Sequence, residues 1–236
     1  MRYFLIAAAT IAALAPVRTD LDAAALPVPV AFQDDAPMLD VPAFEDLAPT
    51  TDARFGRTWR VEGLFGTGTA ALINWKMLGA GQVELCFLSA KHVTDGNGDQ
   101  FILVNEVLGL EIVRASASFV HPDEDAVVIT AVVDADLGAL VASTVMPIRW
   151  ENLALGERVL LDGFGAGERW ITEGRASGPR RISCPLFFGD SGSPLQDADG
   201  NVVGIVVMRG PANHHGHIVP MAAVREWLRG LGLGPR

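Results

Sequence analysis

The chain has 236 residues, half of them hydrophobic, which is enough for one large domain or two small ones with a substantial core. Its formal net charge is −10 and no run of basic residues occurs. This argues against nucleic acid or an anionic membrane surface as the main partner, because clustered Lys and Arg bind phosphate groups. Two cysteines are too few for a disulfide scaffold.

The N-terminal residues 1–25 are predicted to be a signal peptide. Arg2 supplies a short positive start, and residues 3–14 are apolar and rich in alanine. This stretch is shorter than the ~20 apolar residues that a membrane-spanning helix needs, so we expect a secreted or periplasmic protein with no stable membrane anchor after cleavage. Cleavage after Ala15 and after Ala25 are both open. The alternative is an apolar helix packed on the core.

The sequence pattern changes at residue 58. Residues 26–57 are rich in proline, lack a helix or strand period, and are predicted to be a linker or a propeptide. Beyond them, short apolar segments recur between turn residues, which is the pattern of an all-β barrel or sandwich. The expected strands are 69–75, 83–89, 101–104, 107–113, 126–133, 158–164, 202–208 and 217–221. One helix is expected at the end, over residues 222–231, where Val224, Trp227, Leu228 and Leu231 form one apolar stripe.

A serine between glycines is the first candidate for chemistry. In Gly189-Asp190-Ser191-Gly192 the glycines permit backbone dihedrals that other residues avoid, so Ser191 can stand out from a tight turn. The N–H groups of Gly189 and Ser191 could then stabilise an oxyanion. The alternative is an ordinary loop, since Gly, Asp and Ser are common turn residues.

A base and a carboxylate precede this serine in the chain. His92 follows an apolar strand, and Asp125 is the last polar residue before another one, where a histidine N–H would satisfy its carboxylate. Each has a plain alternative, a packed or surface histidine and a solvated acidic cluster. The order His92, Asp125, Ser191 is nevertheless the triad order of chymotrypsin, and differs from the orders of subtilisin and the α/β-hydrolases.

With these residues the chain resembles a trypsin-like (chymotrypsin-fold) serine protease of the compact bacterial secreted type. The resemblance covers roughly residues 58–232 and is carried by 66–68, 88–93, 125–128 and 189–195, with weaker support from 156–164 and 202–206. It implies an all-β fold of two six-stranded antiparallel barrels, at about 58–142 and 143–221, and a C-terminal α-helix. It also implies a catalytic triad of His92, Asp125 and Ser191 in the cleft between the barrels, with an oxyanion hole from Gly189 and Ser191.

The resemblance also places the substrate pocket and raises the question of activation. The pocket candidates are Pro185, Leu186, Val207, Met208 and Arg209. No acidic residue occupies the pocket-base position near Pro185, so we expect an uncharged side chain in the pocket, with an acidic one paired to Arg209 as the alternative. In zymogens of this family the aspartate that corresponds to Asp190 pairs with a newly cut N-terminal amine. Alternatively, Asp190 bonds local backbone or an arginine.

The predicted function is hydrolysis of peptide bonds by a monomeric serine endopeptidase with a polypeptide substrate and no cofactor. The alternatives are an inactive protease fold that serves as a binding or scaffold protein, and an esterase that uses the same triad. His214, His215 and His217 invite a zinc site, but no Cys or carboxylate accompanies them, so no metal is expected. Whether Cys86 and Cys184 form a disulfide stays open.

Overall fold

Short apolar segments separated by turns form the strands of this chain. The computed structural model describes residues 57–64, 66–95, 100–209 and 215–234. The predicted signal peptide (1–25) lies outside the described residues, as does the predicted linker or propeptide except for Arg57. All described residues belong to one unit, Leu39–Arg236.

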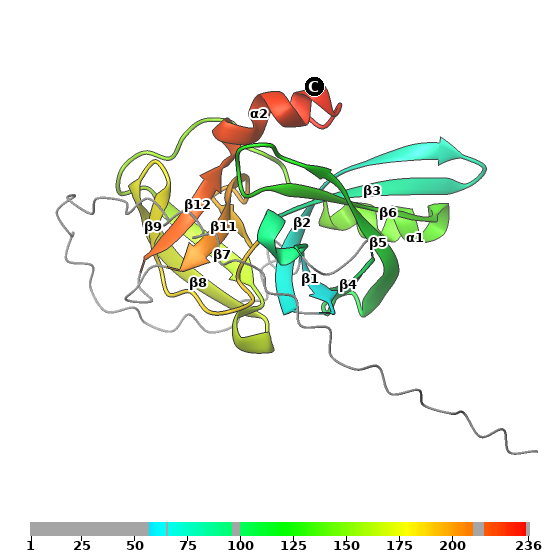
Figure 1. Cartoon of the computed structure of the whole chain (residues 1–236), viewed down its shortest axis with the longest axis horizontal. Helices are drawn as coiled ribbons and strands as arrows, with labels where there is room; N and C mark the ends of the chain where they lie inside the picture. The colour runs from blue at the N-terminus through cyan, green and yellow to red at the C-terminus, as the bar shows by residue number, and fades with distance from the viewer. Residues whose placement is uncertain (1–56, 65, 96–99, 210–214, 235–236) are drawn as a thin grey trace, which may run out of the picture. The chain divides into compact units, whose positions relative to one another are not determined.

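The first six strands close into an antiparallel barrel with the order β1-β2-β3-β6-β5-β4 (Figure 1). Their bounds are β1 Thr58–Gly63, β2 Gly66–Gly79, β3 Gln82–Ser89, β4 Phe101–Asn105, β5 Leu110–Val120 and β6 Val127–Asp134. Helix α1, Ala135–Val141, follows β6 and packs on β3, where Gly138 lies against the Val83 side chain. A 3-10 helix, η1 (Lys91–Val93), follows β3.

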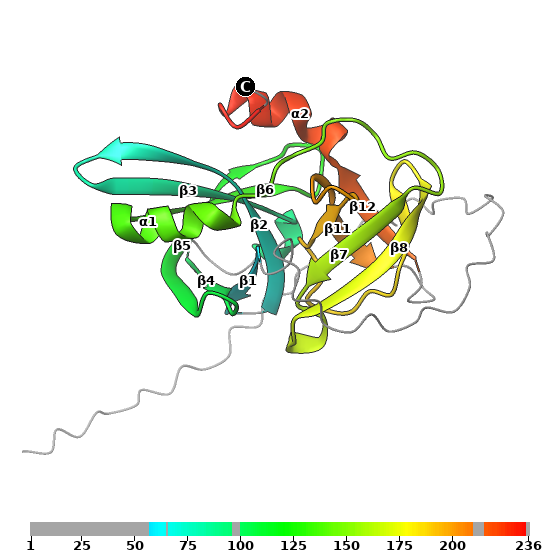
Figure 2. The same ribbon diagram turned by 180° about the vertical axis from the view of Figure 1, so that it is seen from behind.

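The next six strands close into a second antiparallel barrel, β10-β11-β12-β9-β8-β7. Their bounds are β7 Arg158–Gly163, β8 Trp170–Gly178, β9 Arg181–Ser183, β10 Pro194–Gln196, β11 Val202–Arg209 and β12 Gly216–Pro220. Renumbered from its own first strand, this barrel repeats the strand order of the first. Figures 1 and 2 show the two barrels side by side, and the predicted fold of two six-stranded barrels is confirmed.

The C-terminal helix α2, Met221–Gly230, closes the fold. Its predicted apolar stripe is confirmed, because Val224 and Leu228 are buried and Trp227 is partly buried. They join a cluster that contains residues of both barrels, whereas each barrel also has an interior core of its own. The shared members from the first barrel are Ala71, Ile73, Cys86, Leu88, Ala126 and Val128, and those from the second are Val202, Ile205 and Val219.

Several elements differ from the sequence-based expectation. Strands β1, β8, β9 and β10 and helix α1 were not expected. The strand expected over 107–113 begins only at Leu110, because the chain turns just before it, at Gly109 with φ +63°.

Both cysteines are buried free thiols in the structure. Burial raises the pKa of the Cys86 thiol to about 11, and it raises the pKa of Cys184 as well, so both thiols stay protonated at neutral pH. In the described ranges, no helix is long and apolar enough to cross a membrane.

Candidate active site

His92 lies at the end of the first barrel, where β3 gives way to η1. Ala90 keeps an extended backbone (φ −76°, ψ 139°), and the following single turn places His92 beyond the strand. Val93 anchors this turn: it is buried, and its side chain would lie 2.5 Å from a Cβ added at Gly68. The small residue at 68 therefore leaves room for the segment that carries the histidine.

Asp125 reaches His92 because of strand register. Strand β6 pairs with β3 so that Val127 is opposite Ser89. Asp125 lies two residues before Val127, and His92 lies three residues after Ser89, so both lie at the same end of the strand pair. The loop that carries Asp125 is closed by His121, whose Nδ1 accepts hydrogen bonds from the backbone N–H of Asp123 (3.1 Å) and Glu124 (2.9 Å).

The Asp125 carboxylate contacts His92 at two points, the ring and the backbone. His92 Nδ1 lies 2.6 Å from Asp125 Oδ2, and the His92 backbone N–H donates to Asp125 Oδ1 at 3.0 Å. The hydrogen bond to Asp125 raises the pKa of His92 above its ordinary value. Burial opposes ionisation of Asp125, but the hydrogen bonds from the His92 side chain, from the His92 backbone and from the Lys91 backbone outweigh it and lower the pKa of Asp125.

Ser191 sits in a turn that touches both barrels. Gly189 and Gly192 have φ values of +104° and +84°, which glycine adopts readily. The Ser191 carbonyl accepts from the Thr69 N–H at 2.8 Å, and the Gly192 N–H donates to the Val206 carbonyl at 2.7 Å. A Cβ at Gly192 would lie 3.0 Å from the Ala90 nitrogen, so this turn abuts the end of β3.

The Ser191 hydroxyl and the His92 ring do not share a hydrogen bond in the structure as described. Neither does the N–H of Gly189 or of Ser191 donate to any other described residue, which leaves both donors available. The neighbouring Phe188 is 82% exposed and stands at the edge of the turn. Apo geometry of this kind does not argue against catalysis, since such hydrogen bonds often form only with substrate bound.

Asp190 is buried beneath this turn, with partners from its own barrel. Its Oδ1 accepts from the Trp170 indole N–H and its Oδ2 from the Phe187 backbone N–H, both at 2.7 Å. Burial raises the pKa of the Asp190 carboxyl to about 6, although the hydrogen bonds from Phe187, Trp170 and Gly165 favour its ionised form. In the structure Asp190 bonds local backbone, which is one of the expected alternatives. Its side-chain partner is Trp170 rather than an arginine.

The predicted pocket residues lie on neighbouring segments of the second barrel. Leu186 is buried, and its Cδ1 would lie 2.3 Å from a Cβ at Gly216 on β12. Arg209 and Met208 on β11 pair with Gly216 and His217. The remaining candidates, Pro185 and Val207, are both partly buried. Val207 packs against the first-barrel core and the shared cluster, whereas Leu186 belongs to the second-barrel core, so these two candidates contact different clusters. His214 lies outside the described residues, and within them no three His, Cys, Asp or Glu side chains gather to hold a metal.

Comparison with known proteins places this architecture in a family. The model of the trypsin-like peptidase domain matches residues 66–205, more than half of the chain. The chain therefore belongs to the trypsin-like peptidase family, as the sequence resemblance predicted.

Solved structures share the fold at low sequence identity. The active form of the Rv3671c protease from M. tuberculosis superposes with a TM-score of 0.59 at 17% identity, covering 85% of this chain and 95% of that one. Its inactive form gives 0.57 at 20%, covering 76% and 91%. The serine endoprotease from Yersinia pestis gives 0.57 at 20%, covering 78% and 68%. No curated protein sequence matches significantly.

Sequence reasoning missed three side chains around the site. Thr69 and Trp170 bond the turn that carries Ser191, and Arg180 pairs with Glu124 next to Asp125. The only signal in the sequence was the position of Thr69, directly after the Gly66–Gly68 segment that resembles the family.

Proposed function

We propose that the protein is a serine endopeptidase in which His92, Asp125 and Ser191 form the catalytic triad. The observation that carries the proposal is the two-point contact of Asp125 with His92, with a hydrogen bond of 2.6 Å to the ring. Family membership and the glycine-flanked turn at Ser191 support it. A carboxylate bound to Nδ1 leaves Nε2 as the basic nitrogen, which is the tautomer that a general base requires.

In the proposed reaction, the Ser191 hydroxyl attacks a peptide carbonyl while His92 takes its proton. The resulting oxyanion accepts hydrogen bonds from the N–H groups of Gly189 and Ser191. His92 then gives the proton to the leaving amine, which leaves an acyl-enzyme on Ser191. Water, activated by His92, hydrolyses this ester and regenerates the serine. Asp125 holds the imidazole and stabilises its charged form.

The proposed substrate is a polypeptide with an uncharged side chain in the primary pocket. The support is that the candidate residues Pro185, Leu186 and Val207 are all uncharged and none of them would attract a charged substrate side chain. We further propose that a signal peptide directs the protein to a secreted or periplasmic location, and that it acts as a monomer.

The test is the substitution Ser191→Ala, with Ser143→Ala as a matched control because Ser143 is exposed on the 3-10 helix Ala142–Thr144. A fluorophosphonate probe should label the wild type and the control on Ser191 and leave Ser191→Ala unlabelled. Peptide-library cleavage should fall in Ser191→Ala by at least about 10³-fold. Retained cleavage refutes the triad, an unlabelled and inactive wild type favours the scaffold alternative, and turnover of esters alone favours the esterase.

A further inference from the structure

Thr69 on β2 connects the first barrel to the turn that carries Ser191. Its hydroxyl donates to the Gly189 carbonyl at 2.9 Å, and its backbone N–H donates to the Ser191 carbonyl at 2.8 Å. These two bonds hold the carbonyls of two peptide groups, Gly189–Asp190 and Ser191–Gly192, which flank the Asp190–Ser191 peptide. Thr69 itself is fully buried, so water does not compete for them.

Each polar group of Thr69 has a partner. Besides donating to Gly189, the hydroxyl accepts from the Phe164 N–H of the second barrel at 3.3 Å, and the Thr69 carbonyl accepts from the Ser89 hydroxyl at 2.7 Å. A buried polar group without a partner is costly, so removal of the hydroxyl would leave the Gly189 carbonyl and the Phe164 N–H unsatisfied.

Gly189 needs an external anchor of this kind. At φ +104° it has a backbone conformation available mainly to glycine, and glycine has more conformational freedom to lose than any other residue. A Cβ at this position would lie 2.2 Å from the Phe164 carbonyl oxygen, so the second barrel limits one side of the residue. On the other side, the Thr69 hydroxyl holds its carbonyl.

We infer that Thr69 is a positioning residue: its hydroxyl, supplied by the first barrel, orients Gly189 so that the N–H groups of Gly189 and Ser191 point to the same place. This inference rests on the proposed function. Thr69 touches neither substrate nor the reacting atoms and acts only through the turn. Its contribution should therefore appear when negative charge develops on the substrate oxygen, and hardly at all when substrate binds.

The test compares Thr69→Val, which keeps the shape and removes the hydroxyl, with Thr69→Ser, which keeps the hydroxyl. In Thr69→Val we expect kcat to fall about 10- to 100-fold with KM within about threefold, because loss of one oxyanion donor costs ~10²–10³ and misplacement costs less. Thr69→Ser should retain kcat within about threefold. A peptidyl boronic acid, whose adduct with Ser191 places an oxygen at the oxyanion site, should lose affinity in parallel with kcat, whereas the product peptide should not.

Thr69→Ala serves as a second hydroxyl-free variant if Thr69→Val does not fold, and melting temperatures are measured for all. Wild-type kcat in a folded hydroxyl-free variant overturns the inference, as does a rise in KM with unchanged boronic acid affinity. A loss of kcat in Thr69→Ser equal to that in Thr69→Val also overturns it. If the wild type neither cleaves peptides nor reacts with fluorophosphonate, the proposed function itself fails and the role of Thr69 fails with it.

Discussion

The hydrogen-bonded pair of His92 and Asp125 is too exposed to contribute much to folding. The two side chains are 43% and 34% exposed, and pairs of this kind contribute little to stability in water. Its effect is orientational instead: Asp125 binds both the ring and the backbone N–H of His92, so rotation of the imidazole breaks a hydrogen bond of 2.6 Å. The arrangement therefore suits the role of general base that we propose for His92.

The pH dependence of activity should report this pair. In the proposed mechanism only neutral His92 can accept the serine proton, and the hydrogen bond to Asp125 raises the pKa of His92 above its ordinary value. We therefore expect kcat/KM to fall as the pH is lowered through this raised pKa of His92. In Asp125→Asn the cause of the shift is removed, so this limb should move to lower pH, and kcat should fall about 10⁴-fold.

The control for this prediction is Asp123→Asn, which removes a nearby carboxylate that does not contact His92. Its profile should match the wild type within experimental error. Rates measured from about pH 4 to 9 with one peptide substrate decide the matter. An acid limb that stays in place in Asp125→Asn would show that another group controls it.

Single residues of the site were predictable to different degrees from the sequence. His92, Asp125 and Ser191 could be proposed from the sequence because nucleophile, base and carboxylate belong to few residue types and their order along the chain is informative. Thr69 and Trp170 were not found, because they act on backbone carbonyls, an N–H and a carboxylate that only the fold brings near them. Hydrogen bonds between residues this far apart in the chain leave no pattern in the sequence.

At the level of elements, strands with continuous apolar runs were predicted and short or polar strands were not. Strands β3, β6 and β11 have long buried segments of Val, Ile and Leu. By contrast, β9 and β10 have three residues each, and β8 alternates buried residues with charged ones. Helix α1 has only seven residues, one of them Gly138, and a helix of this length is too short to show a helical period in the sequence. The strands among these elements form because they pair with neighbouring strands of the closed barrel, not because of a local sequence pattern.

The loop between β5 and β6 is tied to the second barrel by an ion pair. Arg180, in the turn between β8 and β9, donates from Nη1 and Nη2 to the two carboxylate oxygens of Glu124 at 2.8 and 2.6 Å. These hydrogen bonds lower the pKa of Glu124 and raise the pKa of Arg180. Since Glu124 adjoins Asp125, the pair links the placement of the carboxylate to the second barrel.

A charge exchange tests this link. Arg180→Glu puts like charges next to Asp125 and should lower kcat by about 3- to 10-fold at low salt, because loss of the pair and repulsion together amount to about 1 kcal/mol. The double variant Glu124→Arg with Arg180→Glu should recover most of the loss. The loss of kcat in Arg180→Glu should be smaller at about 1 M salt, because position 180 is half exposed and salt screens charges there.

The control exchanges the charges of another ion pair, Arg158 and Glu173, and shows what a charge exchange and added salt do by themselves. This pair is formed between β7 and β8, within the second barrel and away from the Asp125 loop. Its exchange should leave kcat unchanged. If the double variant at 124 and 180 recovers nothing, or if the control loses as much, the ion pair does not position the loop.

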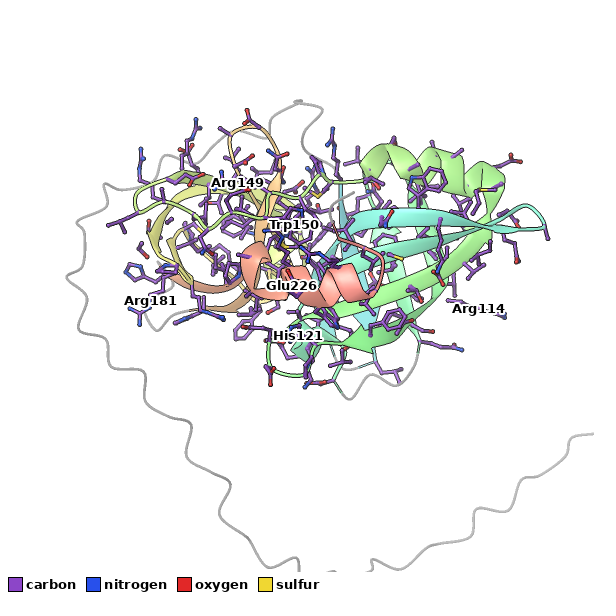
Figure 3. All side chains as sticks on the ribbon, turned by 90° about the horizontal axis from the view of Figure 1, so that it is seen from above. Arg114, His121, Arg149, Trp150, Arg181 and Glu226 are labelled. Atoms are coloured by element: carbon purple, nitrogen blue, oxygen red, sulfur yellow. The ribbon has the colours of Figure 1, made fainter. Side chains whose placement is uncertain are left out.

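On the scale of the whole molecule, the two barrels share one apolar cluster, and helix α2 covers it. The helix also reaches the Asp125 loop, because the Trp227 ring makes an edge-to-face contact with His121 at 5.0 Å between centroids. In Figure 3, His121 lies beside α2. The Ser191 turn and the Asp125 loop are therefore each fixed partly by the opposite half of the molecule, the turn by Thr69 and the loop by Arg180 and Trp227.

This sharing predicts that the barrels unfold together. Leu228 is fully buried in the shared cluster, so Leu228→Ala should lower the free energy of unfolding by about 2–5 kcal/mol, the usual cost of such a cavity. Urea unfolding followed by near-UV and far-UV circular dichroism should give one transition, moved to lower urea without splitting. Labelling by the fluorophosphonate probe should disappear at the same urea concentration. Leu140→Ala on α1, where the side chain is 49% exposed, should change stability by no more than about 0.5 kcal/mol. Two separate transitions, with only one of them moved by Leu228→Ala, would mean that the barrels are independent units and that labelling follows just one of them.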